Sequence, residues 1–322
     1  MQICSPRRRS LHDPCNANWN AAKQTRLVSG ISSQRSAKSC RARWSRAWLL
    51  AHSIRAGGRR HWAQGMFRRL IHLHSPFRDM IEPVPPLLDE KVDRRSRKHL
   101  LQLLDDRHYT DRMNALLRCN GATYGVVSES DARQPAGTHS RDEWEIPRFC
   151  ETRCPDLVDS AELKHWWLPP QPTTPKGPTW DLLSTCKIKG ERGLLLVEAK
   201  AHEQELGRAG KSPPSGSAQS ATNHEHIRGR LSSVSAELRS QNWKVDVNAE
   251  KHYQLANRVA WAWKLSECGV PVILLYLGFL GDTYFSDRFI DRDHWQRAMG
   301  SYMEGVVPLN LPGQEIAGRS GG

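Results

Sequence analysis

The feature that most constrains the fold is a continuous apolar run near the C-terminus. Residues 272–280 read Val-Ile-Leu-Leu-Tyr-Leu-Gly-Phe-Leu and contain no charged side chain. Such a run, bounded by Gly269, is typical of a central strand that is covered on both faces of its sheet. Extended back to Val270 it has 11 residues and includes Pro271, which is far short of the about 20 residues of a transmembrane helix.

The residues before this run predict a sheet in which the apolar strand is one member. Two segments, 179–188 and 193–202, have the composition of strands, and residues 189–192 between them are typical of a hairpin turn. Apolar residues at helical spacing over 249–267 predict a helix that ends at Gly269. Strand, helix and strand in this order predict an α/β fold with a mixed central sheet and a right-handed crossover.

The rest of the chain is divided by composition and spacing. We expect a helical pattern over 89–120, a polar loop over 128–155, a short helix over 156–167, a proline-rich connector over 169–178, a mobile segment over 203–220 and a polar helix over 221–240. The predicted domains are a helical and loop region at 76–155, an α/β domain at 156–311 and a flexible tail at 312–322.

Positive charge is concentrated at the N-terminus. Residues 1–75 hold 15 of the 47 Lys and Arg side chains and one of the 34 acidic side chains, Asp13, so the remainder of the chain is close to neutral. The high isoelectric point therefore does not make the rest of the chain a basic nucleic-acid binder. Residues 1–75 are predicted to be a disordered extension, and three interpretations stay open: a nucleic-acid-binding arm, a transit peptide, or residues upstream of a natural start at Met66 or Met80.

The eight cysteines lie at scattered positions that match no disulfide framework. Cys150 and Cys154 have the spacing of half a zinc site, but no matching His or Cys pair follows, so reduced, buried thiols are the favoured interpretation. No secretory signal is recognisable in the sequence. We expect a cytoplasmic protein without a membrane partner.

The residues that point to chemistry lie at the end of the second predicted strand. The run Leu194-Leu195-Leu196-Val197 is apolar and is followed by Glu198-Ala199-Lys200. Because side chains alternate along a strand, Glu198 and Lys200 share one face, while Val197 and Ala199 occupy the other. Asp181, near the start of the paired strand, is expected to lie across the hairpin from Glu198. Two neighbouring carboxylates repel each other, and a divalent cation between them removes that repulsion.

The pattern Trp180-Asp181 … Glu198-Ala199-Lys200, followed by a helix and a buried strand, resembles the restriction-endonuclease-like PD-(D/E)xK nuclease superfamily. The resemblance covers residues 156–282 and implies a restriction-endonuclease-like core with Asp181, Glu198 and Lys200 as catalytic residues. Asp181 and Glu198 would be metal ligands, and Glu162 and Gln254 would be supporting residues. Trp180 stands where the family usually has proline, and Arg258 stands where some branches carry tyrosine.

These observations predict a nuclease that hydrolyses phosphodiester bonds with Mg²⁺ or Mn²⁺ and acts on nucleic acid, in the first place DNA. In the expected mechanism the carbonyl of Ala199 completes the metal site and Lys200 orients a water. The alternative hypothesis is a catalytically inactive nuclease-fold module that binds protein or nucleic acid, which the near-neutral charge of residues 76–322 favours. The sequence leaves the oligomeric state and the substrate specificity open.

Overall fold

The computed structural model describes residues 46–55, 95–119, 122–170, 176–308 and 315–317, and for 46–55, 119 and 315–317 it describes the backbone alone. The contacts divide the chain into two units, Met1–Arg41 and Ala42–Gly322. All described residues belong to the second unit. The regions expected at 76–155 and 156–311 therefore contribute to one packed unit wherever they are described.

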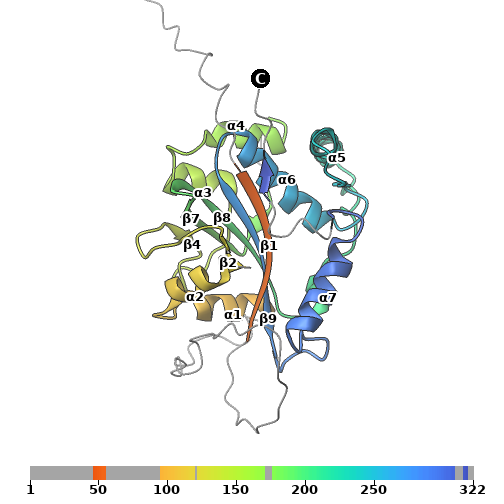
Figure 1. Ribbon diagram of the computed structural model, residues 1–322. Helices are drawn as coiled ribbons and strands as arrows, with labels where there is room; N and C mark the ends of the chain where they lie inside the picture. Colours follow the sequence, from red (N-terminus) through yellow and green to blue (C-terminus); the bar gives the residue numbers. More distant parts are fainter. Residues whose placement is uncertain (1–45, 56–94, 120–121, 171–175, 309–314, 318–322) are drawn as a thin grey trace, which may run out of the picture. The chain divides into compact units, whose positions relative to one another are not determined.

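A six-stranded mixed sheet forms the centre of this unit (Figure 1). Its strands are β1 (Arg46–Arg55), β4 (Arg133–Gln134), β7 (Leu182–Ile188), β8 (Glu191–Lys200), β9 (Val272–Leu280) and β10 (Glu315–Ala317), in the order β10-β1-β9-β8-β7-β4. Strands β1, β9 and β8 are parallel neighbours, whereas β10, β7 and β4 each pair antiparallel with the strand beside them. The predicted mixed α/β sheet is confirmed, with β9 as one of its central strands.

Strand β1 corrects the expectation for the N-terminal segment. It lies within residues 1–75, for which we expected no folded element, and it pairs with β9 along nine residues from Ala47↔Val272 to Arg55↔Leu280. The run Ala47-Trp48-Leu49-Leu50-Ala51 is apolar, and the basic composition of the segment as a whole concealed it. The rest of the predicted extension, 1–45 and 56–75, lies outside the described residues.

The hairpin between β7 and β8 is tighter than expected. Ile188 pairs with Glu191, so the turn consists of Lys189 and Gly190 alone, both with positive φ (50° and 86°). Two residues in this conformation form the turn whose twist matches that of the flanking strands. The short turn fixes the register of the hairpin, and the register decides which side chains face one another at its far end.

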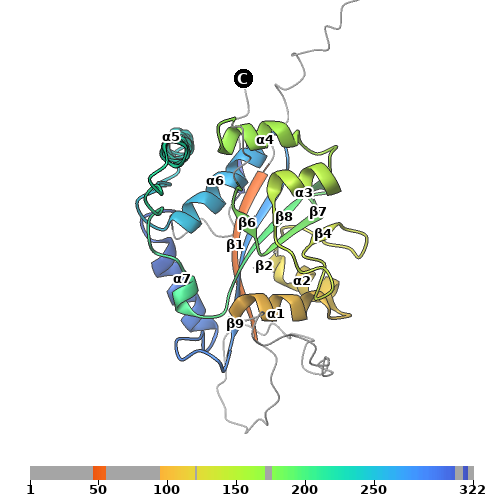
Figure 2. The same ribbon diagram turned by 180° about the vertical axis from the view of Figure 1, so that it is seen from behind.

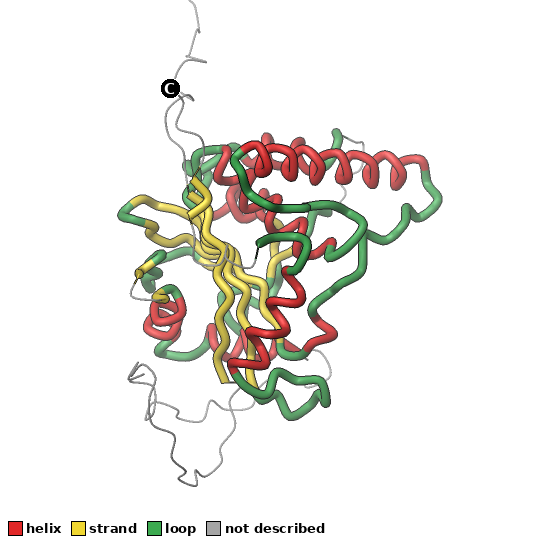
Figure 3. The backbone as a smooth tube through the Cα atoms, turned by 45° about the vertical axis from the view of Figure 1, so that its right-hand side comes forward, coloured by secondary structure: helices red, strands yellow, loops and turns green. Residues whose placement is uncertain are grey.

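Helices cover both faces of the sheet (Figures 1 and 2). Helices α1 (Arg95–Leu104) and α2 (Tyr109–Leu116) pack on the face that carries Leu195 and Val197. The opposite face, with Leu194 and Leu196, is covered by α3 (Ile146–Arg153), α4 (Ser160–Trp167), α5 (Ala218–Ser240), α6 (Tyr253–Glu267) and α7 (Arg292–Met303). Figure 3 shows the strands between these two helical layers.

Several element boundaries differ from the sequence-based expectations. The helical pattern over 89–120 is interrupted after α1, where the Asp106 carboxylate accepts the N–H of His108 at 2.8 Å and so starts a turn. The region 128–155, expected as a loop, contains β4, α3 and β5 (Trp144–Glu145), and β5 pairs with β6 (Thr179–Trp180). Short strands β2 (Arg118–Cys119) and β3 (Ala122–Thr123) pair with each other, and a 3-10 turn, η2, spans Glu203–Glu205. Strand β10 lies inside the predicted flexible tail.

Candidate functional site

The register of the β7–β8 hairpin brings Asp181 beside Glu198. Leu182, the first residue of β7, is paired with Val197, so Asp181 just before it lies beside Glu198 and Ala199 of β8, close to the position expected from the sequence. Asp181 itself lies between β6 and β7 and is half-buried. Its Oδ2 accepts the backbone N–H of Ala199 at 2.7 Å, which holds the carboxylate against the end of β8.

Glu198 is buried, at 2% exposure, and its carboxylate accepts three side-chain donors. Lys200 Nζ and Gln254 Nε2 donate to Oε1 at 2.5 and 2.7 Å, and Arg258 Nε donates to Oε2 at 2.7 Å. Lys200 is likewise buried and lies on the same face of β8, since Val197 and Ala199 belong to the core on the other side. The predicted alternation of this strand is confirmed, and Gln254 is in contact with the predicted residues.

Arg258 is a residue whose contribution to the site was not predicted from the sequence. It lies one helical turn after Gln254 on α6, where residues four apart share a face. Besides its bond to Glu198, it donates from Nη2 to the Thr179 carbonyl at 2.8 Å and stacks over the Trp180 ring, 4.3 Å from the centroid. Arg258 thus connects α6 to β6 and β8. The spacing from Gln254 was the signal that could have found it.

The pKa values of the two carboxylates are shifted in opposite directions. Burial, reinforced by the charge of Glu198, raises the pKa of Asp181 to about 8, although Lys200 and the Ala199 N–H oppose the shift. Burial also acts to raise the pKa of Glu198, but the charges of Arg258 and Lys200 outweigh it and hold that pKa below its usual range. Near neutral pH one acid is therefore ionised and its neighbour holds a proton, an arrangement found where two acids divide roles in catalysis.

A third acid, Glu143, lies next to Asp181. The pairing of Trp144 with Trp180 sets Glu143 opposite Asp181 in the β5–β6 register, and Glu143 Oε2 accepts the Thr179 hydroxyl at 3.3 Å. Its charge also contributes to the raised pKa of Asp181. Sequence reasoning missed Glu143 because its segment has the composition of a loop.

Glu162, expected as a supporting residue, is not brought to the site. It is exposed on the first turn of α4 and accepts the ammonium of Lys264 at 2.7 Å. Lys264 lies ten residues after Gln254 on the same helix, which corresponds to about 15 Å along the axis. The expectation failed because α4 packs against the C-terminal half of α6, whereas the site lies at its N-terminal half.

The site fits a divalent cation only in part. Mg²⁺ accepts carboxylate and carbonyl ligands and retains several waters. Within the described part of the chain Asp181 Oδ1 accepts no hydrogen bond, and the Ala199 carbonyl points to the same side of β8 as the Ala199 N–H that reaches Asp181. However, Glu198 is already bonded to two cationic side chains. Among the described residues, no group of three or more His, Cys, Asp or Glu side chains is arranged to hold a metal. Asp181, Glu198 and Ala199 would hold a cation weakly, with water completing its coordination.

His202 continues the face of Glu198 and Lys200 by one more step, and the structure gives it a partner. Its Nδ1 lies 3.1 Å from Asp287 Oδ2, and its ring stacks on Phe285 with centroids 4.0 Å apart. His202 is therefore a hydrogen-bonded polar neighbour of the site.

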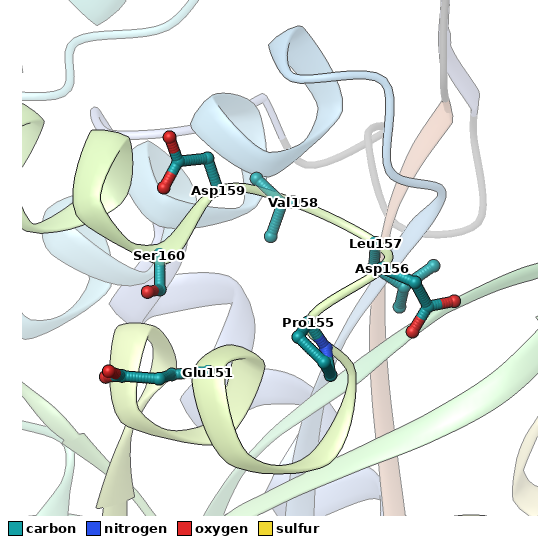
Figure 4. Close-up of a pocket in the computed structure, with 7 residues that line it drawn as sticks. All are labelled: Glu151, Pro155, Asp156, Leu157, Val158, Asp159 and Ser160. Atoms are coloured by element: carbon teal, nitrogen blue, oxygen red, sulfur yellow. The ribbon is translucent and has the colours of Figure 1, made fainter.

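A separate surface hollow lies between α3 and α4 and is lined by several acids (Figure 4). Glu151 is paired with Lys164 at 2.8 Å, Asp156 with Arg192 at 2.6 Å, and Asp159 caps the first turn of α4. Because each carboxylate has a partner, the hollow is not a second candidate site. Cys150 and Cys154 nearby are buried, reduced thiols, as expected.

Comparisons of the chain with protein-family models, with curated proteins and with solved structures found no match. Among the helices that the structure describes, none combines the length and apolar composition needed to cross a bilayer.

Proposed function

We propose that the chain is a divalent-metal-dependent nuclease with a restriction-endonuclease-like core, which hydrolyses phosphodiester bonds, in the first place those of DNA. The observation that carries the proposal is the convergence of Asp181, Glu198 and Lys200 at the end of one hairpin, where Asp181 contacts the backbone between the other two. A lysine beside two closely spaced acids has a role in hydrolysis that a binding module does not need.

The residues of the chain divide the work as follows. Asp181, Glu198 and the Ala199 carbonyl would hold a Mg²⁺ or Mn²⁺ ion, which would supply Lewis-acid chemistry at the phosphodiester when bound. Lys200 orients the attacking water and stabilises negative charge that develops on the phosphate. Gln254 and Arg258 fix the carboxylate of Glu198 from α6.

The alternative is a nuclease-fold module without catalysis, and one observation favours it. The charge of Glu198 is already compensated by Lys200 and Arg258, so the buried cluster is stable without a metal. The two hypotheses therefore differ in whether a metal binds at all.

The test is a cleavage assay on the full chain with plasmid, linear and single-stranded DNA and with RNA, in Mg²⁺, Mn²⁺ or EDTA. We expect metal-dependent cleavage that Asp181→Asn and Lys200→Ala reduce at least 100-fold, the scale of removing one preorganised group. Glu237→Gln, a substitution on the partly buried side of α5 away from the site, serves as the control. Cleavage that persists in both site variants would refute the assignment, and absence of metal binding by calorimetry in the wild type would support the binding module.

A further inference from the structure

Two chain segments are paired beside the N-terminus of α6. The backbone N–H groups of His252 and Tyr253 donate to the carbonyls of Arg208 and Ala209, each at 3.0 Å, and Lys211 N donates to the Ala249 carbonyl at 2.7 Å. These bonds hold residues 207–211 against residues 249–253. The segment 203–220, which we expected to be mobile, is thus anchored along this part.

Gly210 allows this close approach. A Cβ atom at position 210 would lie 2.3 Å from the Glu250 carbonyl oxygen, closer than any side chain permits. The glycine therefore fixes how near the two segments lie.

The pairing gathers positive side chains. Arg208 and Lys251 are exposed, and Lys211 is half-buried with its Nζ 5.0 Å from the centre of the Tyr253 ring. In the part of the chain that the structure describes, no acid forms an ion pair with any of these three residues, and the nearby Glu250 is paired with Arg228. Burial together with the charges of Arg208 and Lys251 lowers the pKa of His252, which lies between them. We call Arg208, Lys211 and Lys251 the basic cluster.

The basic cluster borders the candidate site. Gln254, which donates to Glu198, follows His252 by two residues, and a Cβ atom on Gly207 would lie 3.8 Å from Gln254 Oε1. The same end of α6 carries the positive end of the helix dipole, which adds to the potential there. A strand of phosphates that passes the site would meet the basic cluster next.

We propose that Arg208, Lys211 and Lys251 bind the phosphate backbone of nucleic acid and position it beside Glu198 and Asp181. Cations held close together without counterions repel each other, and a polyanion relieves that repulsion. A small phosphate would require an enclosed pocket, whereas these side chains are spread over an accessible surface. The choice of a nucleic acid as the polyanion rests on the proposed function.

The test measures binding without catalysis. Fluorescence anisotropy of a labelled 20-base-pair DNA duplex in EDTA gives the affinity of the full chain between 50 and 200 mM salt. The variants are Arg208→Gln and Lys251→Gln, and the control is Lys187→Gln on β7. Lys187 is also an exposed cation but lies next to the hairpin turn, six residues along the strand from Asp181 and about 20 Å away.

Each phosphate contact contributes about 0.9 to the slope of log affinity against log salt concentration. We expect each cluster variant to lower the magnitude of the slope by about this amount. Between 50 and 200 mM salt, the factor by which its affinity decreases should then be roughly 3.5 times smaller than the factor for the wild type. Lys187→Gln should keep the wild-type slope. Residues 1–75 are the same in every variant, so a difference between variants reports the substituted side chain.

Equal slopes for the cluster variants and the control, or no binding of the duplex by the wild type, would overturn the inference. The cleavage assay is a separate readout. A chain that binds through the basic cluster but does not cleave with Mg²⁺ supports the inference and refutes the nuclease. A chain that cleaves while its cluster variants keep the wild-type slope supports the nuclease and refutes the inference about the basic cluster.

Discussion

Replacing Arg258 with methionine removes one of the two cations bonded to Glu198 while keeping most of the aliphatic volume. Arg258 and Glu198 are 6% and 2% exposed, so the carboxylate that remains has little access to water. Removing one partner of a buried ion pair costs about 3–5 kcal/mol. The loss of the bond to the Thr179 carbonyl adds to this, while Lys200 retains part of the compensation.

We therefore expect Arg258→Met to lower the free energy of unfolding by about 3–5 kcal/mol. With a denaturant slope of about 3 kcal/mol per molar, the urea midpoint falls by roughly 1–1.7 M. The matched control is Arg239→Met, because Arg239 pairs with Asp246 at the same 2.7 Å but on the surface, where an ion pair contributes less than about 1 kcal/mol.

A double-mutant cycle with Glu198→Gln isolates the pairwise interaction. The double variant should be less destabilised than the sum of the single variants by about 1–3 kcal/mol, because it no longer buries a charge without its partner. Two results would refute the reasoning: an Arg258→Met midpoint equal to that of Arg239→Met, or additive effects in the cycle.

Three further predictions concern titration, the supporting residues and the N-terminal strand. The pKa of Asp181 in the folded protein is about 8, above its ordinary 3.8, so the folded protein binds the proton more tightly than the unfolded chain. The stability that this proton contributes is therefore lost as the pH rises from about 4 to 8. Asp181→Asn should remove that decline, so that at pH 8 in EDTA its free energy of unfolding, measured with urea, exceeds that of the wild type by a few kcal/mol. Parallel dependences of stability on pH in the two proteins would contradict this. Gln254→Ala should reduce cleavage at least 10-fold whereas Glu162→Gln should leave it unchanged, and equal losses in kinetic assays would place Glu162 in the site after all. Deleting residues 1–65 removes β1 and should lower the melting temperature by more than about 10 °C, whereas deleting residues 1–45 leaves β1 in place; equal melting temperatures would show that β1 is dispensable.

The sequence predicted the parts of the fold that local patterns determine. The apolar run of β9 matched its strand, and the alternation at Glu198 and Lys200 set both side chains on one face. Asp181 lies beside Glu198 because the two-residue turn at Lys189 and Gly190 selects that register. The four-residue turn expected at 189–192 would have shifted the register by two residues and set Asp181 level with Lys200.

Features that depend on distant contacts could not be predicted. Glu143 reaches Asp181 through the pairing of β5 with β6, two strands of two residues each, which no periodicity reveals. Glu162 was misplaced because the sequence does not determine which half of α6 receives α4. The spacing from Gln254 sets Arg258 on the same face of α6, but its bond to Glu198 joins residues 60 positions apart and could not be predicted.

The place of β1 in the sheet has a consequence for synthesis of the protein. Ala47 pairs with Val272, so this strand must wait for a partner that is translated 225 residues later. At about 5–20 residues per second, the interval is roughly 10–45 s. During that time an apolar segment of the chain has neither neighbour in its sheet, which is the situation in which nascent chains bind chaperones or aggregate. Efficient production of this protein should therefore depend on chaperone supply and on the rate of translation more strongly than its length alone implies.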